Sequence, residues 1–227
     1  LMLGAVTAVS GPLEDGGWRR DMPPLTVVAV LAVLASTALS RTRWHELLAW
    51  PVAIVAGAGV VVWQTLVMAG PGTLSQRVDA VYYRFEAWFD VAFSDQVTND
   101  ALPFNVLILA LTWLGVYLFA WSVTRWHNAW IGLVPGGVAL FLDLILVGDE
   151  LTGAIVLYML FGFLLVMQTN LLANIERWRR QGANYPAMIN LTFLHFSAWA
   201  LVALLSFSFV VPAGPFSTPA PVQTAID

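Results

Sequence analysis

The stretch ALPFNVLILALTWLGVYLFAWSV, residues 101–123, contains no charged side chain. The hydrocarbon core of a bilayer is about 30 Å thick, and a helix of about 20 apolar residues crosses it. A strand of a membrane barrel would instead alternate apolar and polar residues over about ten positions. We therefore interpret 101–123 as a membrane-spanning helix and the chain as an all-α integral membrane protein.

The composition of the whole chain supports this interpretation. Of its 227 residues, 59% are hydrophobic and 11% are charged, whereas soluble domains are roughly 45–50% apolar and about 25% charged. Six further apolar runs predict a bundle of about seven transmembrane helices. With 101–123 they make a polytopic membrane domain over 1–211, the other spans being 1–10, 24–40, 47–69, 129–147, 151–173 and 191–211.

Residues 74–92 are predicted to form an outer amphipathic helix. Apolar residues recur there at steps of three and four, and Arg77, Arg84 and three acids occupy the opposite face. Such a helix lies at a membrane interface with its apolar side against acyl chains or the top of the bundle. Packing on the spans is favoured over a gate or a docking surface. The aromatic residues that define the apolar side are Tyr82, Phe85, Trp88 and Phe89.

Arginine placement predicts the orientation. The loops 41–46, 124–128 and 174–186 carry six of the ten arginines and two of the fourteen acids. Cytoplasmic loops are enriched in basic residues, so these three loops are predicted to lie inside. The Pro-rich stretch 212–227 then lies outside, and its composition is typical of an extended linker.

Three stretches in the second half of the chain occur in a family-specific order. They are Thr98–Trp121, Arg125–Leu144 with its Pro-Gly-Gly, and Asn170–Pro186 with its arginine-rich segment. In this order the chain resembles the membrane-spanning N-terminal region of bacterial membrane-anchored transglutaminase-like proteins. The likeness runs from about residue 85 to the C-terminus, and the first 70 residues match only as generic spans. The resemblance implies an extracytoplasmic transglutaminase-like domain beyond the spans, with a cysteine–histidine–aspartate centre.

The leading functional hypothesis is a non-catalytic membrane anchor or scaffold. The chain contains no cysteine, so we predict no catalytic residue and no enzyme activity in it. The anchor would hold the outer domain at the bacterial inner membrane, as a multi-pass protein with its C-terminus outside. An accessory helical subunit of a larger membrane complex is the alternative. A small transporter is less favoured, because inverted repeats and several intramembrane charges would be expected.

The predicted partners follow from the same hypothesis. They are the lipid bilayer and either the outer domain of the same protein or other membrane subunits. The formal net charge of −4 gives no footprint for nucleic acid. No metal and no cofactor is predicted, but bound lipids are expected.

Few polar residues lie inside the predicted spans. Asp143 is a candidate intramembrane polar site, because an acid within a span is costly and often functional; a structural role is favoured over proton or ion handling. His195 is a candidate haem or pigment ligand, with a hydrogen-bonded structural role favoured. The segment Pro135-Gly136-Gly137 is expected to kink its helix or to let a neighbour pack closely.

Overall fold

The computed structural model describes residues 1–15, 23–42, 46–94, 100–147, 152–182 and 188–210. This part of the chain is all-helical and contains no strand. Contacts divide the chain into two units, Leu1–Tyr185 and Pro186–Asp227. The first unit holds α1 (Met2–Asp15), α2 (Leu25–Arg41), α3 (Glu46–Met68), α4 (Leu74–Ala92), α5 (Leu102–Arg125), α6 (Trp130–Val147) and α7 (Thr152–Arg180); the second holds α8 (Ile189–Val210).

Three of the described helices, α3, α5 and α7, are long and apolar enough to cross a membrane. Helices α2 and α6 are apolar but shorter. Each of the seven ranges predicted as spans contains one helix, so the all-helical architecture is confirmed, while crossing by all seven stays a prediction. Helix α7 continues to Arg180, beyond the span predicted to end at 173. At 29 residues it is about 43 Å long, more than the core of a bilayer requires.

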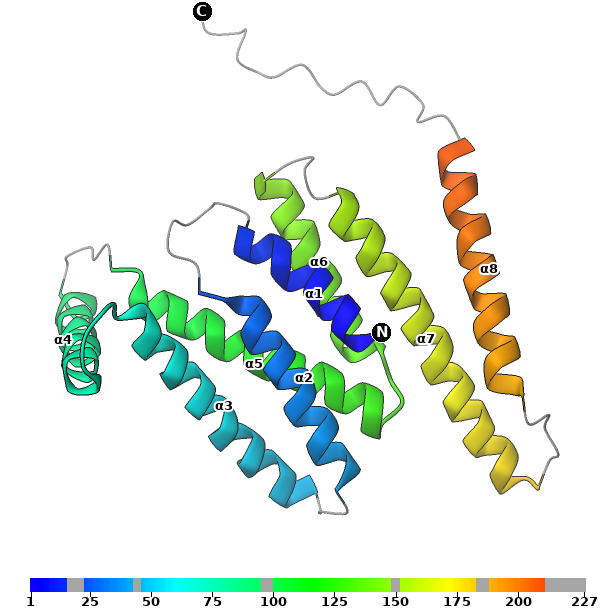
Figure 1. Ribbon diagram of the computed structural model, residues 1–227, viewed down its shortest axis with the longest axis horizontal. Helices are drawn as coiled ribbons and strands as arrows, with labels where there is room; N and C mark the ends of the chain where they lie inside the picture. Colours follow the sequence, from blue (N-terminus) through cyan, green and yellow to red (C-terminus); the bar gives the residue numbers. More distant parts are fainter. Residues whose placement is uncertain (16–22, 43–45, 95–99, 148–151, 183–187, 211–227) are drawn as a thin grey trace, which may run out of the picture. The chain divides into compact units, whose positions relative to one another are not determined.

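The interior of the first unit is formed by α1, α2 and α5. Helix α2 packs along α5, and α1 lies between α2, α6 and α7 (Figure 1). The contacts use small residues that bring the backbones close, and Val28, Ala29, Ala32 and Ala120 are completely buried. Small residues at the contact are typical of helix packing in membranes. Helix α1 was predicted only as a short first span over 1–10. In the structure it extends to Asp15 and its buried residues belong to the core.

Two glycines allow aromatic side chains to pack directly on a neighbouring helix backbone. A Cβ at Gly57 of α3 would lie 2.2 Å from the indole nitrogen of Trp113 in α5. That indole nitrogen also donates a hydrogen bond to the carbonyl of Ala53, at 3.2 Å. A Cβ at Gly132 of α6 would lie 2.1 Å from the ring of Phe119. Any larger residue at either position would separate the two helices.

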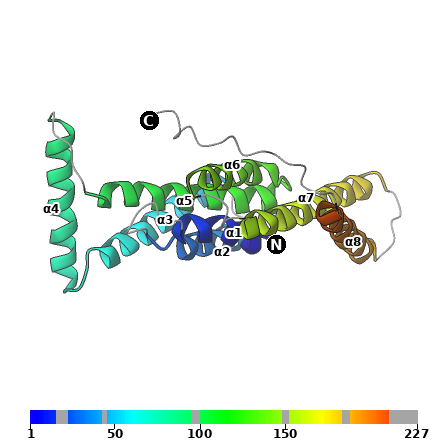
Figure 2. The same ribbon diagram turned by 90° about the horizontal axis from the view of Figure 1, so that it is seen from above.

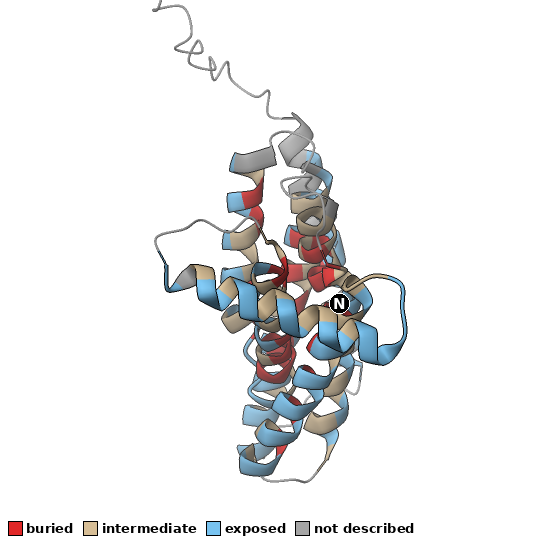
Figure 3. Cartoon of the chain, turned by 90° about the vertical axis from the view of Figure 1, so that its left-hand side faces the viewer, coloured by how far each residue is buried: buried red, intermediate tan, exposed pale blue. Residues whose placement is uncertain are grey.

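Helix α4 lies crosswise at the end of α3 and the start of α5 (Figure 2). Its first turn is stabilised by a capping box, in which the Thr73 side chain accepts from the Gln76 backbone N–H and the Gln76 side chain accepts from that of Thr73. This satisfies two backbone donors that the helix itself cannot pair. Figure 3 shows α4 in front of the bundle, with its residues exposed or half-buried and the buried residues behind it. The helix predicted over 74–92 is confirmed with the same bounds.

Candidate functional site

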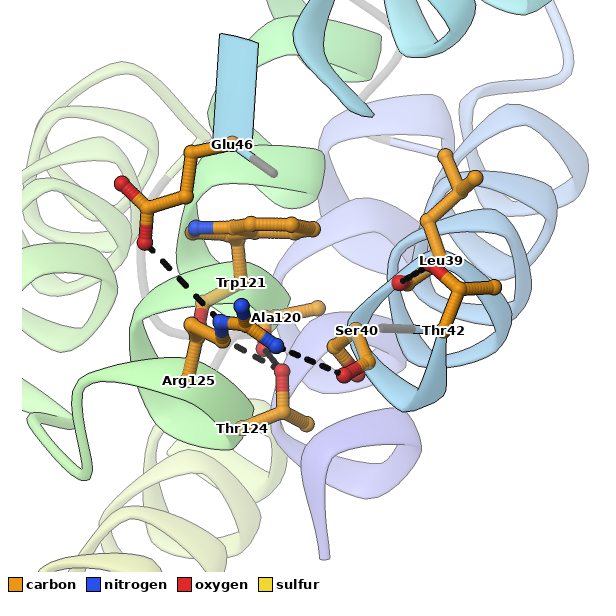
Figure 4. Close-up of polar contacts among 8 residues, drawn as sticks. All are labelled: Leu39, Ser40, Thr42, Glu46, Ala120, Trp121, Thr124 and Arg125. Carbon is orange, nitrogen blue, oxygen red and sulfur yellow. Dashed lines mark hydrogen bonds and ion pairs between the residues drawn. The ribbon is translucent and has the colours of Figure 1, made fainter. Parts of the chain in front are cut away.

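Arg125, the last residue of α5, joins three helices at one end of the bundle, called here the basic end (Figure 4). Its guanidinium donates to the Ser40 carbonyl in α2 at 3.4 Å and lies 3.9 Å from a Glu46 carboxylate oxygen in α3. It also sits over the Trp121 ring, 5.9 Å from the centroid. Because the ion pair is part exposed, it contributes at most about 1 kcal/mol. The contacts of Arg125 bring the ends of α2 and α5 together with the start of α3.

A cavity of about 450 Å³ opens at the same basic end, and we call it the basic-end cavity. It is lined by the start of α1, the last turns of α2 and α5, and the second half of α7. Arg41, His127 and Gln168 contribute polar side chains to it. The four helix segments come from both halves of the unit, so this cavity could not be identified from the sequence. The only signal there was the arginine content of the predicted inner loops.

His127, two residues after the end of α5, has an unusual backbone conformation. The Asn128 N–H donates to the Ser122 carbonyl at 3.0 Å, and φ of His127 is +51°. A helix ending of this kind places its left-handed residue where glycine is usual. A side chain in the left-handed region costs roughly 1–2 kcal/mol. In this conformation His127 lines the basic-end cavity.

Asp143 is fully enclosed in the bundle. It is 2% exposed, and neither carboxylate oxygen has a hydrogen-bond partner among the described residues. It lies on the same face of α6 as the buried Leu140 and Leu133, toward the core that α1 helps to form. Burying a carboxyl group that has no hydrogen-bond partner is costly, so Asp143 adds no stability through the contacts that the described residues make. Nothing in the described part of the chain brings a second ionisable group to it.

Helix α4 is turned differently from the sequence prediction. Arg77 and Arg84, predicted on the solvent face, are half-buried on the side that faces the bundle. The Arg84 guanidinium forms a two-pronged pair with Asp100, just before α5, with an Nε–Oδ2 distance of 2.8 Å. Phe85 and Trp88 share this half-buried side. The arginines face inward because an acid from the following segment pairs with one of them.

The remaining apolar residues of α4 form an exposed stripe beside the bundle-facing side. Tyr82 is 63% exposed and Phe89 is 51% exposed, and Leu74 and Val78 continue the stripe toward the start of the helix. The acids Asp79, Glu86 and Asp90 lie farther round, opposite the bundle. The helix thus has three faces: one against the bundle, one acidic, and one lateral and aromatic. A lateral apolar face is what an interfacial helix requires.

The Pro135-Gly136-Gly137 segment lets Tyr158 of α7 approach α6 closely. Close packing of a neighbour was one of the two alternatives predicted for this segment. A Cβ at Gly136 would lie 2.9 Å from the Tyr158 hydroxyl oxygen, which donates a hydrogen bond to the Leu133 carbonyl. On either side of this contact are apolar cavities of about 580 Å³ between α6 and α7 and about 230 Å³ among α1, α5 and α6. Both are lined by Leu133 and Tyr158.

His195 lies in α8, the helix of the second unit. Its Nε2 accepts a hydrogen bond from the Trp199 indole nitrogen at 2.9 Å, one turn away along the same helix. This local contact occupies the ring nitrogen that most often binds a metal or a haem. Among the described residues, no group of three histidines, cysteines or acids is close enough to hold a metal ion. The favoured interpretation of His195 as a hydrogen-bonded histidine agrees with this geometry.

No family model matches the sequence, and no curated protein or solved structure matches it either. The class is therefore defined by the fold alone. The described residues form an all-helical protein, and three of the helices among them are long and apolar enough to cross a membrane.

Proposed function

We propose that this chain is the membrane-spanning anchor of a bacterial transglutaminase-like protein, with seven spans and no catalytic activity of its own. It would hold an extracytoplasmic domain at the inner membrane through the Pro-rich tail. The proposal joins the sequence resemblance to the close packing of α2 on α5 at the centre of the bundle. The alternative of a transporter would require a polar path that crosses the bundle.

The observation that carries the proposal is the packing at the centre of the bundle. The completely buried residues there are small or apolar, and they pair α2 directly with α5. Large apolar side chains cover the outside instead, among them Leu47 at 77% and Val55 at 72% exposed. A bundle that is apolar outside and closely packed where α2 meets α5 suits a lipid-embedded scaffold.

The arrangement of helix ends supports the proposed orientation. The start of α1, the ends of α2 and α5 and the second half of α7 line one cavity, and the start of α3 reaches the same end through Glu46. These are the ends that the arginine distribution assigns to the cytoplasm. Helix α4 lies at the opposite ends of α3 and α5, which suits an outer interfacial helix.

Reporter fusions test the anchor function. Alkaline phosphatase, which is active only outside the cytoplasm, is fused after Asp227 and, as the matched control, after Gln181. We expect activity only from the first fusion, and we expect it to stay with membranes washed at alkaline pH. Purified chain should incorporate no amine into a glutamine substrate. Phosphatase activity only after Gln181, or release of the Asp227 fusion by the wash, would contradict the proposal.

The subunit alternative is supported by one surface. The lateral stripe of α4, with Tyr82 and Phe89 exposed, is a face that another membrane protein could cover. Native gel electrophoresis in mild detergent separates the two cases. A single chain with bound detergent supports the anchor. A larger complex of fixed composition supports the subunit, provided that it dissociates in the double variant Tyr82→Ser with Phe89→Ser.

A further inference from the structure

We propose that the basic-end cavity binds a phosphate ester that carries hydroxyl groups, with the head group of an anionic glycerophospholipid as its source. The inference goes beyond the anchor function, and it rests on that proposal only for the bilayer around the cavity. The volume of about 450 Å³ lies within the usual range of small-molecule sites.

The cavity offers donors that nothing in the described part of the chain uses. Within that part no hydrogen bond or ion pair engages the Arg41 guanidinium, the His127 imidazole or the Gln168 amide, and all three line the cavity. No carboxylate is found among the described residues that line it. An arginine fork matches the geometry of a phosphate and binds it through charge-assisted hydrogen bonds.

These donors are not required to cap the helices that end here. The Leu39 carbonyl of α2 accepts from the Thr42 backbone N–H and hydroxyl (Figure 4). The next carbonyl of α2, that of Ser40, accepts from Arg125, and the Ser122 carbonyl of α5 accepts from Asn128. Since these three carbonyls have partners other than Arg41 and His127, those two side chains remain available to a ligand.

The hydroxyls of the cavity specify a ligand that itself donates. Each of these hydroxyls donates its hydrogen bond to a backbone carbonyl of its own helix, so its oxygen lone pairs remain available as acceptors in the cavity. Hydroxyl groups on the ligand would donate to these lone pairs, while its phosphate accepts hydrogen bonds from Arg41 and His127. The four residues are Thr37, Ser40, Thr124 and Thr169.

The apolar part of the lining favours a lipid over a free phosphate ester. Met2, Val123, Leu165 and Leu172 share the cavity with the polar side chains. A soluble ester would leave these side chains without a partner, whereas a glycerophospholipid places the start of its acyl chains against them. Phosphatidylglycerol has both the phosphodiester and the free hydroxyls, and phosphatidylcholine has the phosphodiester alone.

The test measures lipid retention by the full chain. Protein purified in detergent is equilibrated with equal amounts of phosphatidylglycerol and phosphatidylcholine, and bound lipid is counted by native mass spectrometry. The variant is Arg41→Gln with His127→Gly, and the matched control is Arg179→Gln, an exposed arginine at the end of α7. A glycine at 127 suits the positive φ, so the variant should fold. A third arm offers soluble glycerol 3-phosphate.

We expect the wild-type chain and Arg179→Gln to retain phosphatidylglycerol preferentially. Loss of one charge-assisted donor to the phosphate should lower the amount of phosphatidylglycerol retained at least about tenfold in the double variant. Unchanged retention of phosphatidylglycerol by the double variant, or an equal loss in Arg179→Gln, would overturn the site. Glycerol 3-phosphate that displaces the lipid at equal concentration would overturn the lipid as its source. The reporter fusions are independent of all these results, so the two proposals fail separately.

Discussion

Gly57→Ala tests how α3 and α5 are held together. The added Cβ would lie 2.2 Å from the indole nitrogen of Trp113 and 2.4 Å from its Cδ1. Trp113 is only 3% exposed, so its rigid ring has no free space into which to move. The methyl group would therefore separate the helices and break the hydrogen bond from the indole to the Ala53 carbonyl.

Gly59→Ala is the matched control, two residues along the same helix. No heavy atom lies within 4 Å of a Cβ at Gly59, and the residue is exposed. Both substitutions gain the same helix propensity, about 0.8–1.0 kcal/mol. The difference between the two variants therefore isolates the tertiary contact.

The magnitude follows from two effects. Overpacking in a tight contact costs about 1–3 kcal/mol, and losing the hydrogen bond costs about 0.5–1.5 kcal/mol. We expect the free energy of unfolding of Gly57→Ala to lie about 1.5–4.5 kcal/mol below that of Gly59→Ala. Unfolding by sodium dodecyl sulfate in mixed micelles, followed by far-ultraviolet circular dichroism, measures both variants. Equal stability of the two would refute the close packing of Trp113 on α3.

Three further substitutions test other contacts by the same unfolding assay. Asp143→Asn replaces an unpaired buried carboxyl group with an amide of the same shape, so stability should stay equal or rise; a loss above about 2 kcal/mol would mean that the carboxyl group is paired. Arg84→Ala and Asp100→Ala should show a coupling energy of about 0.2–1 kcal/mol, because the pair is part exposed; strict additivity would contradict the pairing. Tyr158→Phe should lose about 0.5–1.5 kcal/mol with its hydrogen bond to α6, and an unchanged stability would argue against that bond.

Much of the helical architecture could be predicted because most apolar runs in the sequence begin and end close to where the helices begin and end. The three-four periodicity of its apolar residues predicted α4 with the correct bounds, and the capping box of Thr73 and Gln76 is the physical reason why it begins there. Helix α7 was predicted too short. Hydropathy measures the part that can lie in lipid, whereas the polar residues before Arg180 continue the same helix, helped by the Glu176–Arg180 pair.

The details of the site depend on packing between distant segments. Arg84 was predicted on the solvent face of α4 because periodicity ranks residues by polarity and contains no information about Asp100. The basic-end cavity combines side chains from four helices, so no local pattern indicates it. His127 occupies a left-handed position that glycine usually fills. Because no glycine marks this helix end in the sequence, the sequence does not indicate it.

Cysteine labelling measures the topology most directly, because the native chain has no cysteine. Ala87→Cys lies on an exposed position of α4, and Gln181→Cys lies just beyond the end of α7. With the inner membrane intact, we expect a membrane-impermeant maleimide to label Ala87→Cys and to reach Gln181→Cys only after the membrane is opened. Labelling of Gln181→Cys in intact cells, or protection of Ala87→Cys, would contradict the proposed anchor and its orientation.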